Sequence, residues 1–334
     1  MKVAIHHTQG SFSEHWIEYC QQNNVPFKIV NCYDNDIISQ VKDCDALMWH
    51  HHHENYKDVL FAKALLFSLE QAGIKIFPDF NTAWHFDDKV GQKYLLEAIG
   101  APLAPSFIFY TKKDALNWVN ETSFPKVFKL RGGSGAANVK LVKNKSQAKR
   151  FVNSAFGRGF PQFDRVFNLK ERIRKVKEGK GSYLGILKGI GRLIIPTEFG
   201  KMRAPEKGYV YFQEFIPDNK TDFRIKIVSN RCWGFQRKVR DNDFRASGSD
   251  NIIYDREQIP ISMIKAAFSV SNRLNLQSVA FDFVLKNGTP LIVEMSYGFG
   301  IDKDEFDFGY WDSDLEWHEG KFNPYGWMVE EVLK

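Results

Sequence analysis

The sequence predicts a mixed α/β (α+β) protein that begins with a small parallel sheet and ends with antiparallel strands. Strand-like and helix-like segments alternate over the first hundred residues, which is the βαβ order of a parallel sheet. Near the C-terminus, two apolar segments at 281–285 and 291–296 flank an Asn-Gly pair, a pattern typical of a β-hairpin. The 334 residues suffice for two or three domains with their own cores.

The composition narrows the class of protein. A hydrophobic content of 43% and a charged content of 26% are ordinary for a soluble globular chain. No apolar run approaches a membrane span, and residues 1–6 read as a first strand and not as a signal peptide. Four widely spaced cysteines indicate a reduced, cytoplasmic protein. The net charge of +6 suits an anionic substrate or nucleotide, while the absence of a dense basic arm argues against a nucleic-acid binder.

In the first hundred residues we expect strands at 2–6, 27–31, 45–49 and 74–77, with helices at 13–23, 36–42 and 57–71. Ligands of such sheets bind at the carboxyl ends of the strands, and two of these ends carry His6-His7 and the run His50–His53. Four neighbouring side chains on a loop splay apart, which disfavours a shared metal ion. A polar loop that lines a substrate cleft and a purely structural loop both remain open, and His50 is the candidate substrate contact.

A glycine-rich loop follows the next predicted elements, which are a helix at 90–99, a strand at 106–110 and a helix at 113–121. A strand ends at Lys129, the loop Gly132–Gly135 comes after it, and a second strand covers 139–142. The glycine spacing fits neither a P-loop nor a dinucleotide-binding fingerprint. A loop between antiparallel strands can present backbone N–H groups to phosphates, with Lys129 as the point charge. A plain hairpin turn is the alternative.

The segment from 156 to 203 is strongly basic. Apolar residues recur at helical spacing among basic ones between 165 and 180, so we expect a helix there. Its basic side chains form either a solvated face or a rim that gathers an anionic acceptor, such as a uronic acid, a phosphorylated sugar or an acidic peptide. Arg203 lies just before the next strand and is a candidate substrate contact.

Three strands, a loop and a helix precede the hairpin. An apolar strand over 210–217 breaks at Pro217, as expected of a hinge with free backbone groups for an adenine edge. The next strand, 222–228, alternates charged with apolar residues and is predicted to have one solvated face. A basic strand follows at 233–240, then a small-residue loop with Arg245, and then a helix at 262–274.

The hairpin carries one carboxylate on each strand. Alternation places Asp282 on the face opposite Phe281 and Phe283, and it separates Glu294 from its apolar neighbours in the same way. Together with the hydroxyl group of Ser296, these carboxylates make a hard oxygen site suited to magnesium. Solvated acids on a surface hairpin are the alternative. The aromatic tail that follows either stacks on sugars or wraps over the core.

A set of short motifs, taken in their order along the chain, resembles the ATP-grasp superfamily of carboxylate–amine ligases. The motifs are Asp-Lys, Pro-x-Val-x-Lys with its glycine loop, Gln-Glu-Phe-Ile, Asp-x-Arg, Asp-Phe-Arg, Phe-Asp-Phe and Val-Glu-Met-Ser. RimK-like, glutathione-synthetase-like and D-alanine–D-alanine ligase-like enzymes are the most similar branch, and the match covers about 88–296. The resemblance implies the ATP-grasp fold, with an N-terminal parallel α/β domain (1–104), a small antiparallel lid subdomain with a basic helical insertion (105–205) and a C-terminal α+β subdomain with the metal site (206–334). The ATP cleft would lie between the last two.

The resemblance also implies roles for individual residues. The phosphates of ATP are assigned to Lys89, Lys129, Gly132, Gly133, Ser134 and Gly135. The adenine hinge and ribose are assigned to Gln213, Glu214, Phe215, Ile216 and Asp222, catalysis to Lys129 and Arg245, and the metal to Asp282, Glu294 and Ser296. Apart from the resemblance, the candidate substrate contacts are Arg203, Arg224 and His50. Two positions depart from the family pattern. Ser296 stands where asparagine is usual, and Ala246-Ser247 replaces a common Ser-Asn.

The implied activity is ATP-dependent ligation. A carboxylate, on a small molecule, an anionic saccharide or an acidic peptide, is activated as an acyl phosphate and attacked by an amine. One or two Mg²⁺ ions are expected, with Mn²⁺ as the alternative ion. A small-molecule kinase and a non-catalytic nucleotide-binding module are the competing hypotheses. The sequence leaves the oligomeric state open, with a homodimer among the options.

Overall fold

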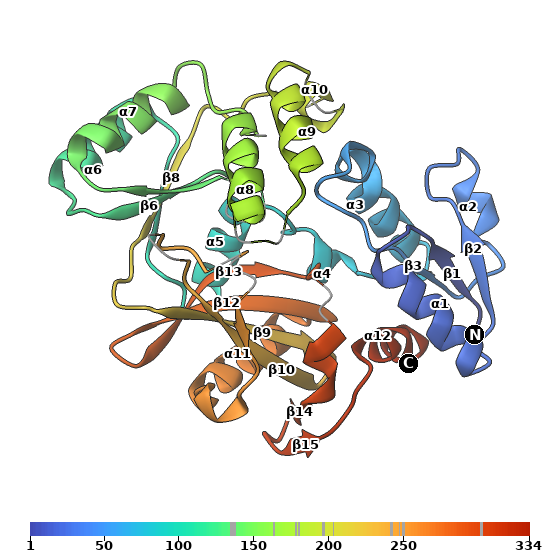
Figure 1. The fold of residues 1–334 in the computed structure, drawn as a ribbon. Coiled ribbons are helices and arrows are strands. Elements are labelled where there is room, and N and C mark those ends of the chain that lie inside the picture. The colour runs from blue at the N-terminus through green and yellow to red at the C-terminus, as the bar shows by residue number, and fades with distance from the viewer. Residues whose placement is uncertain are drawn as a thin grey trace. The chain divides into compact units, whose positions relative to one another are not determined.

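The computed structural model describes the whole chain except residues 134–137, 163, 178, 180, 196–197, 203, 241–242, 247, 249–250 and 301–302. The chain divides into two compact units, each assembled from separate stretches of sequence (Figure 1). Unit 1 comprises Met1–Phe86, Tyr94–Leu103 and Asp218–Lys334, and unit 2 comprises Asp87–Lys93 and Ala104–Pro217. The predicted boundaries after residues 104 and 205 stay predictions. Among the described residues, no helix combines the length and the apolar content that crossing a membrane requires.

Unit 1 begins with the predicted parallel sheet, which is confirmed. Its strand order is β2-β1-β3-β4, and every neighbouring pair is parallel. The strands alternate with helices in the expected βαβ order: β1 (Val3–His6), α1 (Phe12–Gln22), β2 (Phe27–Val30), α2 (Ile37–Gln40), β3 (Ala46–Met48), α3 (Tyr56–Gln71), β4 (Lys75–Phe77) and α4 (Phe80–Ala83). The cysteines at 20, 32, 44 and 232 are free and buried.

The second sheet of unit 1 carries the predicted hairpin. Its order is β13-β12-β9-β10-β14-β15, with β11 paired to β10. Apolar side chains of the central strands pack under the helix α11 and form one core. The elements are β9 (Thr221–Val228), β10 (Arg231–Lys238), β11 (Ile252–Ile253), η1 (Arg256–Gln258), α11 (Ile261–Leu274), β12 (Ser278–Lys286), β13 (Thr289–Ser296), η2 (Lys303–Asp307), β14 (Gly309–Asp312), β15 (Trp317–Glu319) and α12 (Pro324–Leu333).

The hairpin itself closes through a two-residue turn. Asn287 has φ 51° and Gly288 has φ 79°, and Lys286 pairs with Thr289 across the turn. Two consecutive positive φ angles match the right-handed twist of the strands, which explains the Asn-Gly pair. A β-bulge follows Asp282, since Asp282 pairs with Glu294 whereas the next residue, Phe283, pairs with Ile292.

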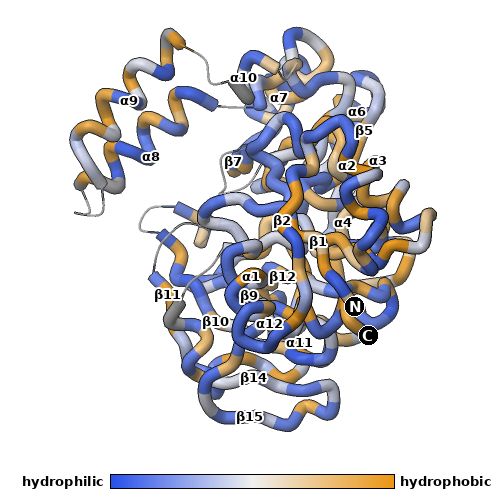
Figure 2. Tube along the Cα trace, turned by 90° about the vertical axis from the view of Figure 1, so that its right-hand side faces the viewer, coloured by the Kyte–Doolittle hydropathy of each residue, from blue (hydrophilic) through white to orange (hydrophobic). Residues whose placement is uncertain are grey.

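Unit 2 contains an antiparallel sheet of order β5-β8-β6-β7. The helices α6 and α7 pack together over one face, and their apolar side chains enclose Phe128 and Phe212. Two further helices, α8 and α9, lie side by side as a pair in both views (Figures 1 and 2). The elements are α5 (Lys89–Ala98, shared with unit 1), β5 (Ser106–Phe109), α6 (Lys112–Glu121), β6 (Lys126–Lys129), β7 (Val139–Val142), α7 (Lys145–Ala155), α8 (Arg165–Lys177), α9 (Tyr183–Ile194), α10 (Glu198–Met202) and β8 (Val210–Glu214).

Candidate functional site

The charged residues of β9 lie on one face of the larger sheet in unit 1. Because side chains alternate along a strand, Asp222, Arg224 and Lys226 share this face, while Phe223 and Ile225 enter the core on the other. The prediction that this face is solvated is wrong at Lys226, which is only 1% exposed, whereas Asp222 and Arg224 are partly exposed. The segment after β13 covers Lys226, since Gly300 and Glu305 accept hydrogen bonds from its ammonium group.

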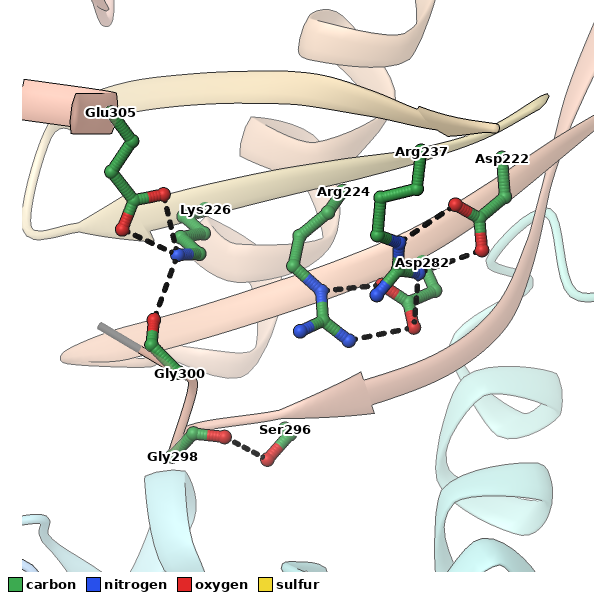
Figure 3. A network of polar contacts seen from close by, with 9 residues as sticks. All are labelled: Asp222, Arg224, Lys226, Arg237, Asp282, Ser296, Gly298, Gly300 and Glu305. Atoms are coloured by element: carbon green, nitrogen blue, oxygen red, sulfur yellow. Dashed lines mark hydrogen bonds and ion pairs between the residues drawn. The ribbon is translucent and has the colours of Figure 1, made fainter. Parts of the chain in front are cut away.

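Alternating charges form a continuous row across three strands (Figure 3). Arg224 donates from Nε and Nη2 to the two carboxylate oxygens of Asp282, at 2.8 and 2.9 Å. Arg237 makes the same two-point contact with Asp222, at 2.8 and 2.7 Å, and its Nη2 also lies 3.0 Å from Asp282 Oδ2. Two carboxylates are thus interleaved with two guanidinium groups, an arrangement that fixes all four side chains.

The two carboxylates of the row titrate differently. Burial alone would raise the pKa of Asp282, but the guanidinium groups of Arg224 and Arg237 outweigh it and hold this pKa well below its usual value. The pKa of Asp222 is raised, because burial and the charge of Asp282 exceed the effect of its single arginine partner. Asp282 therefore stays ionised, and Asp222 is the first of the two to accept a proton.

Lys226 continues the row towards the C-terminal segment. Its Nζ donates to both carboxylate oxygens of Glu305 at 2.7 Å and to the carbonyl oxygen of Gly300 at 3.2 Å. The ring of Phe299 lies 4.7 Å from the same ammonium group. Burial lowers the pKa of Lys226 to about 8, although Glu305 partly compensates. This amine therefore loses its charge only slightly above neutral pH.

The residues predicted to bind metal lie on β12 and β13, in register with Arg224 and Lys226 of β9. Asp282 and Glu294 are direct cross-strand partners, and Ser296 Oγ donates to the carbonyl oxygen of Gly298 at 2.6 Å. No group of three or more His, Cys, Asp and Glu side chains within the described ranges is arranged to hold a metal ion. The fit to Mg²⁺ therefore depends on two carboxylates and a hydroxyl group. These are the hard oxygen donors that Mg²⁺ prefers, and Asp282 Oδ1 keeps one lone pair beyond its bond to Arg224.

The predicted substrate contact His50 lies close to the loop that follows β13. Its Nδ1 accepts a hydrogen bond from the backbone N–H of Phe12 at 3.2 Å, and the two rings stack at 3.7 Å. A Cβ atom added to Gly298 would lie 3.3 Å from His50 Nε2. Unit 1 therefore brings His50 within reach of the segment that ends the hairpin. Burial lowers the pKa of His50 well below its ordinary value, so the ring is neutral.

In unit 2, Lys129 and Gln213 occupy the sheet face opposite the helices. Val127 pairs with Gln213 and Lys129 pairs with Tyr211, so these four side chains share a face. Gln213 Nε2 donates to Ser106 Oγ at 3.1 Å, which holds the amide in place. The next residue in β8, Glu214, belongs to the other face, where its carboxylate accepts from Lys126 Nζ at 2.7 Å.

The first half of the glycine-rich loop is bound to the start of α5. Lys89 Nζ donates to the carbonyl oxygen of Gly133 at 2.7 Å, and Asp87 Oδ1 accepts from the N–H of Gly133 at 2.6 Å. Gly133 has φ +110°, and a Cβ atom there would lie 2.4 Å from Asn138 Nδ2, so only glycine fits. The predicted phosphate contacts Ser134 and Gly135 lie outside the described residues.

Two predicted site residues, Arg245 and Arg203, remain to be placed. Arg245 lies beside Asp243, to which its Nε and Nη2 donate at 2.9 and 2.6 Å. Arg203 falls outside the described residues. The sequence-based site omitted Arg237, Lys226 and Glu305. The alternation of charges in 222–226 was the available signal for Lys226, because it places this residue in line with Asp222 and Arg224.

No family model and no curated protein matches the chain. Several solved structures, however, are similar to it. A RimK-domain ATP-grasp protein from Sphaerobacter thermophilus has a TM-score of 0.57 at 15% identity, with both chains covered to 100%. D-alanine–D-alanine ligase from Bacillus anthracis complexed with ATP has a TM-score of 0.54 at 14% identity, covering 91% of this chain and 88% of the ligase. The ATP-grasp ligase PsnB, complexed with minimal precursor, Mg and ADP, has a TM-score of 0.54 at 11% identity, covering 99% and 97%. The chain therefore has the ATP-grasp fold.

Proposed function

We propose that this protein is an ATP-dependent carboxylate–amine ligase. The charged face of the larger sheet in unit 1 carries the proposal, because it places Asp282 opposite Glu294 and next to Arg224. Two adjacent carboxylates suit a metal ion that binds nucleotide phosphates, and a partly exposed arginine beside them suits an anionic substrate. The likeness to ligases complexed with ATP, or with Mg and ADP, supports the same reaction class.

The chemistry begins from the poor reactivity of a carboxylate. Its oxygen attacks the γ-phosphorus of ATP, the bond to the β-phosphate oxygen breaks, and ADP leaves. The resulting acyl phosphate accepts an amine at its carbonyl carbon. Phosphate then departs, the nitrogen loses a proton, and an amide bond remains. Each step needs charge stabilisation and exclusion of water more than a protein nucleophile.

Each predicted site residue would have a separate role in the ligation. Lys129 and Lys89 would stabilise negative charge on the phosphates, and the backbone at Gly132 and Gly133 would border them. Gln213 to Ile216 would supply the adenine hinge, largely through backbone atoms. Mg²⁺, when bound by Asp282, Glu294 and Ser296, would neutralise phosphate oxygens. Arg224 and His50 would orient the substrate carboxylate, and Arg245 would stabilise charge on the transferring group.

The test is a screen of carboxylates for ADP release, followed by a screen of amines with mass spectrometry of the products. We expect at least one carboxylate to stimulate ADP release and an amide to appear once an amine is added. Replacing Glu294 with Gln should lower ADP release by about a hundredfold or more. The matched control is Glu121→Gln, an exposed glutamate on α6, which should keep full activity.

Other results would contradict the proposal. ADP release without any amide product, with every amine tested, would instead indicate a kinase. ATP binding without turnover would indicate a nucleotide-binding module. Full activity of the Glu294→Gln variant would remove the assignment of the metal site.

A further inference from the structure

The helix α9 in unit 2 exposes a row of large apolar side chains. Five of them are between 47% and 79% exposed. Tyr183, Leu184, Leu187 and Ile190 recur along one side of the helix, and Ile195 follows directly after its last residue. The orange segments of α9 in Figure 2 mark its hydrophobic residues. We call these residues the apolar stripe. Isolated exposed apolar side chains are common, but a continuous stripe on one helix indicates a surface that binds something.

The orientation of the stripe is fixed by the partner helix α8. A Cβ atom on Gly189 would lie 2.9 Å from Arg172 Cδ and 3.0 Å from Leu169 Cδ1, so α8 packs directly on the glycine side of α9. Arg172 Nη1 donates to the carbonyl oxygen of Gly185 at 3.1 Å, and Arg165 Nη1 donates to that of Leu193 at 3.0 Å. The two arginines bind both ends of α9 to α8, and the apolar stripe remains on the side away from α8.

The charge of the segment around α9 is exceptional for this chain. Residues 164–203 contain eleven Lys and Arg against four Asp and Glu, a net charge of +7, whereas the whole chain carries +6. The other 294 residues are therefore slightly acidic in sum. Lys188 and Arg192 follow one another by one helical turn at the edge of the stripe. An apolar stripe bordered by basic residues is typical of helices that lie in a membrane interface.

We propose that α9 binds the surface of a lipid bilayer that contains anionic lipids. Its 12 residues are too few to cross a bilayer, so the helix would lie parallel to the surface with the apolar stripe among the acyl chains. Lys188 and Arg192 would contact anionic headgroups, and Tyr183 suits the interfacial layer. This proposal does not depend on the proposed ligase activity.

The test is flotation of the purified full chain with vesicles of phosphatidylcholine alone, or with about 30% phosphatidylglycerol, at low and high salt. We expect binding to the anionic vesicles only, and binding that weakens as salt rises. The triple variant Leu184→Ser, Leu187→Ser, Ile190→Ser should bind the anionic vesicles at least about tenfold more weakly than the wild type. The matched control is Leu60→Ser on α3 of unit 1, a leucine that is 79% exposed and is not one of the stripe residues; it should bind like the wild type.

Three results would overturn the proposal. They are equal binding to neutral and anionic vesicles, no binding to either, and unchanged binding of the triple variant. A concentration-dependent dimer that the triple variant abolishes, in the absence of vesicle binding, would assign the stripe to a second copy of the chain. Because the three replaced side chains are exposed, the variant should keep its thermal midpoint and circular dichroism spectrum, so loss of folding will not imitate loss of binding.

Discussion

Arg224 and Asp282, which are 58 positions apart in the sequence, form a two-point ion pair across the adjacent strands β9 and β12. The pair lies in the middle of the charged face, and Asp282 also contacts Arg237 at 3.0 Å. Asp282 is thus both a predicted metal ligand and the link between two arginines. Its contributions to stability and to activity can be separated by substitution.

Removal of either partner of this pair should be costly. Asp282→Asn leaves two arginines without their shared counter-charge, so we expect a loss of about 3 kcal/mol in the free energy of unfolding. Arg224→Met should cost about 1–3 kcal/mol, because its side chain is partly exposed and Asp282 keeps Arg237. Urea unfolding of both single variants and of the double variant measures the coupling. Strictly additive losses would show that the pair contributes nothing, despite its geometry.

Gly133 should tolerate alanine worse than Gly100. Gly133 and Gly100 both have positive φ, at +110° and +65°, but only Gly133 has a neighbour in the way, namely Asn138 Nδ2 at 2.4 Å. Asn138 cannot move freely, since it is buried and donates to Gly132 and Gln162. We expect Gly133→Ala to cost about 2 kcal/mol or more and Gly100→Ala about 1 kcal/mol. Thermal unfolding compares them, and equal losses would contradict the steric argument.

The hairpin was predictable because its signals are local. Asn287-Gly288 specifies the turn, and period-two alternation separates Asp282 from Phe281. The pairing of Arg224 with Asp282 was not predictable, since the sequence does not say which strand lies beside β9. Nor does the sequence say that the segment after β13 lies over β9, so the burial of Lys226 against Glu305 and Gly300 was not predictable either. The bulge after Asp282 has no clear sequence signal, because Val293 is an ordinary strand residue.

Acid should destabilise the protein through His51. This ring is buried, its Nε2 has no hydrogen-bond partner among the described residues, and burial lowers its pKa to about 3. Below about pH 6.5 the unfolded chain binds a proton that the folded chain does not. The free energy of unfolding should therefore fall by about 1.4 kcal/mol per pH unit from this residue alone, between pH 6 and 4. His51→Phe keeps an aromatic ring against Phe86 and Tyr297. It should remove the contribution of His51 to the pH dependence of the free energy of unfolding. Identical pH profiles would refute the assignment.

Alkali should have the opposite effect through Lys226. Its pKa is about 8 in the folded protein and 10.5 in the reference state, so between these values the unfolded chain binds the extra proton. Stability should therefore rise with pH across this window, by about 3 kcal/mol in total from this residue. The double variant Lys226→Met, Glu305→Gln removes the charge and its buried partner together, so no charge is left unpaired. We expect chemical unfolding between pH 7.5 and 10 to show a steeper rise for the wild type than for this variant. A wild-type profile that is flat relative to the variant would mean that Glu305 keeps Lys226 protonated throughout, and that the ammonium group is a permanent charge on this face.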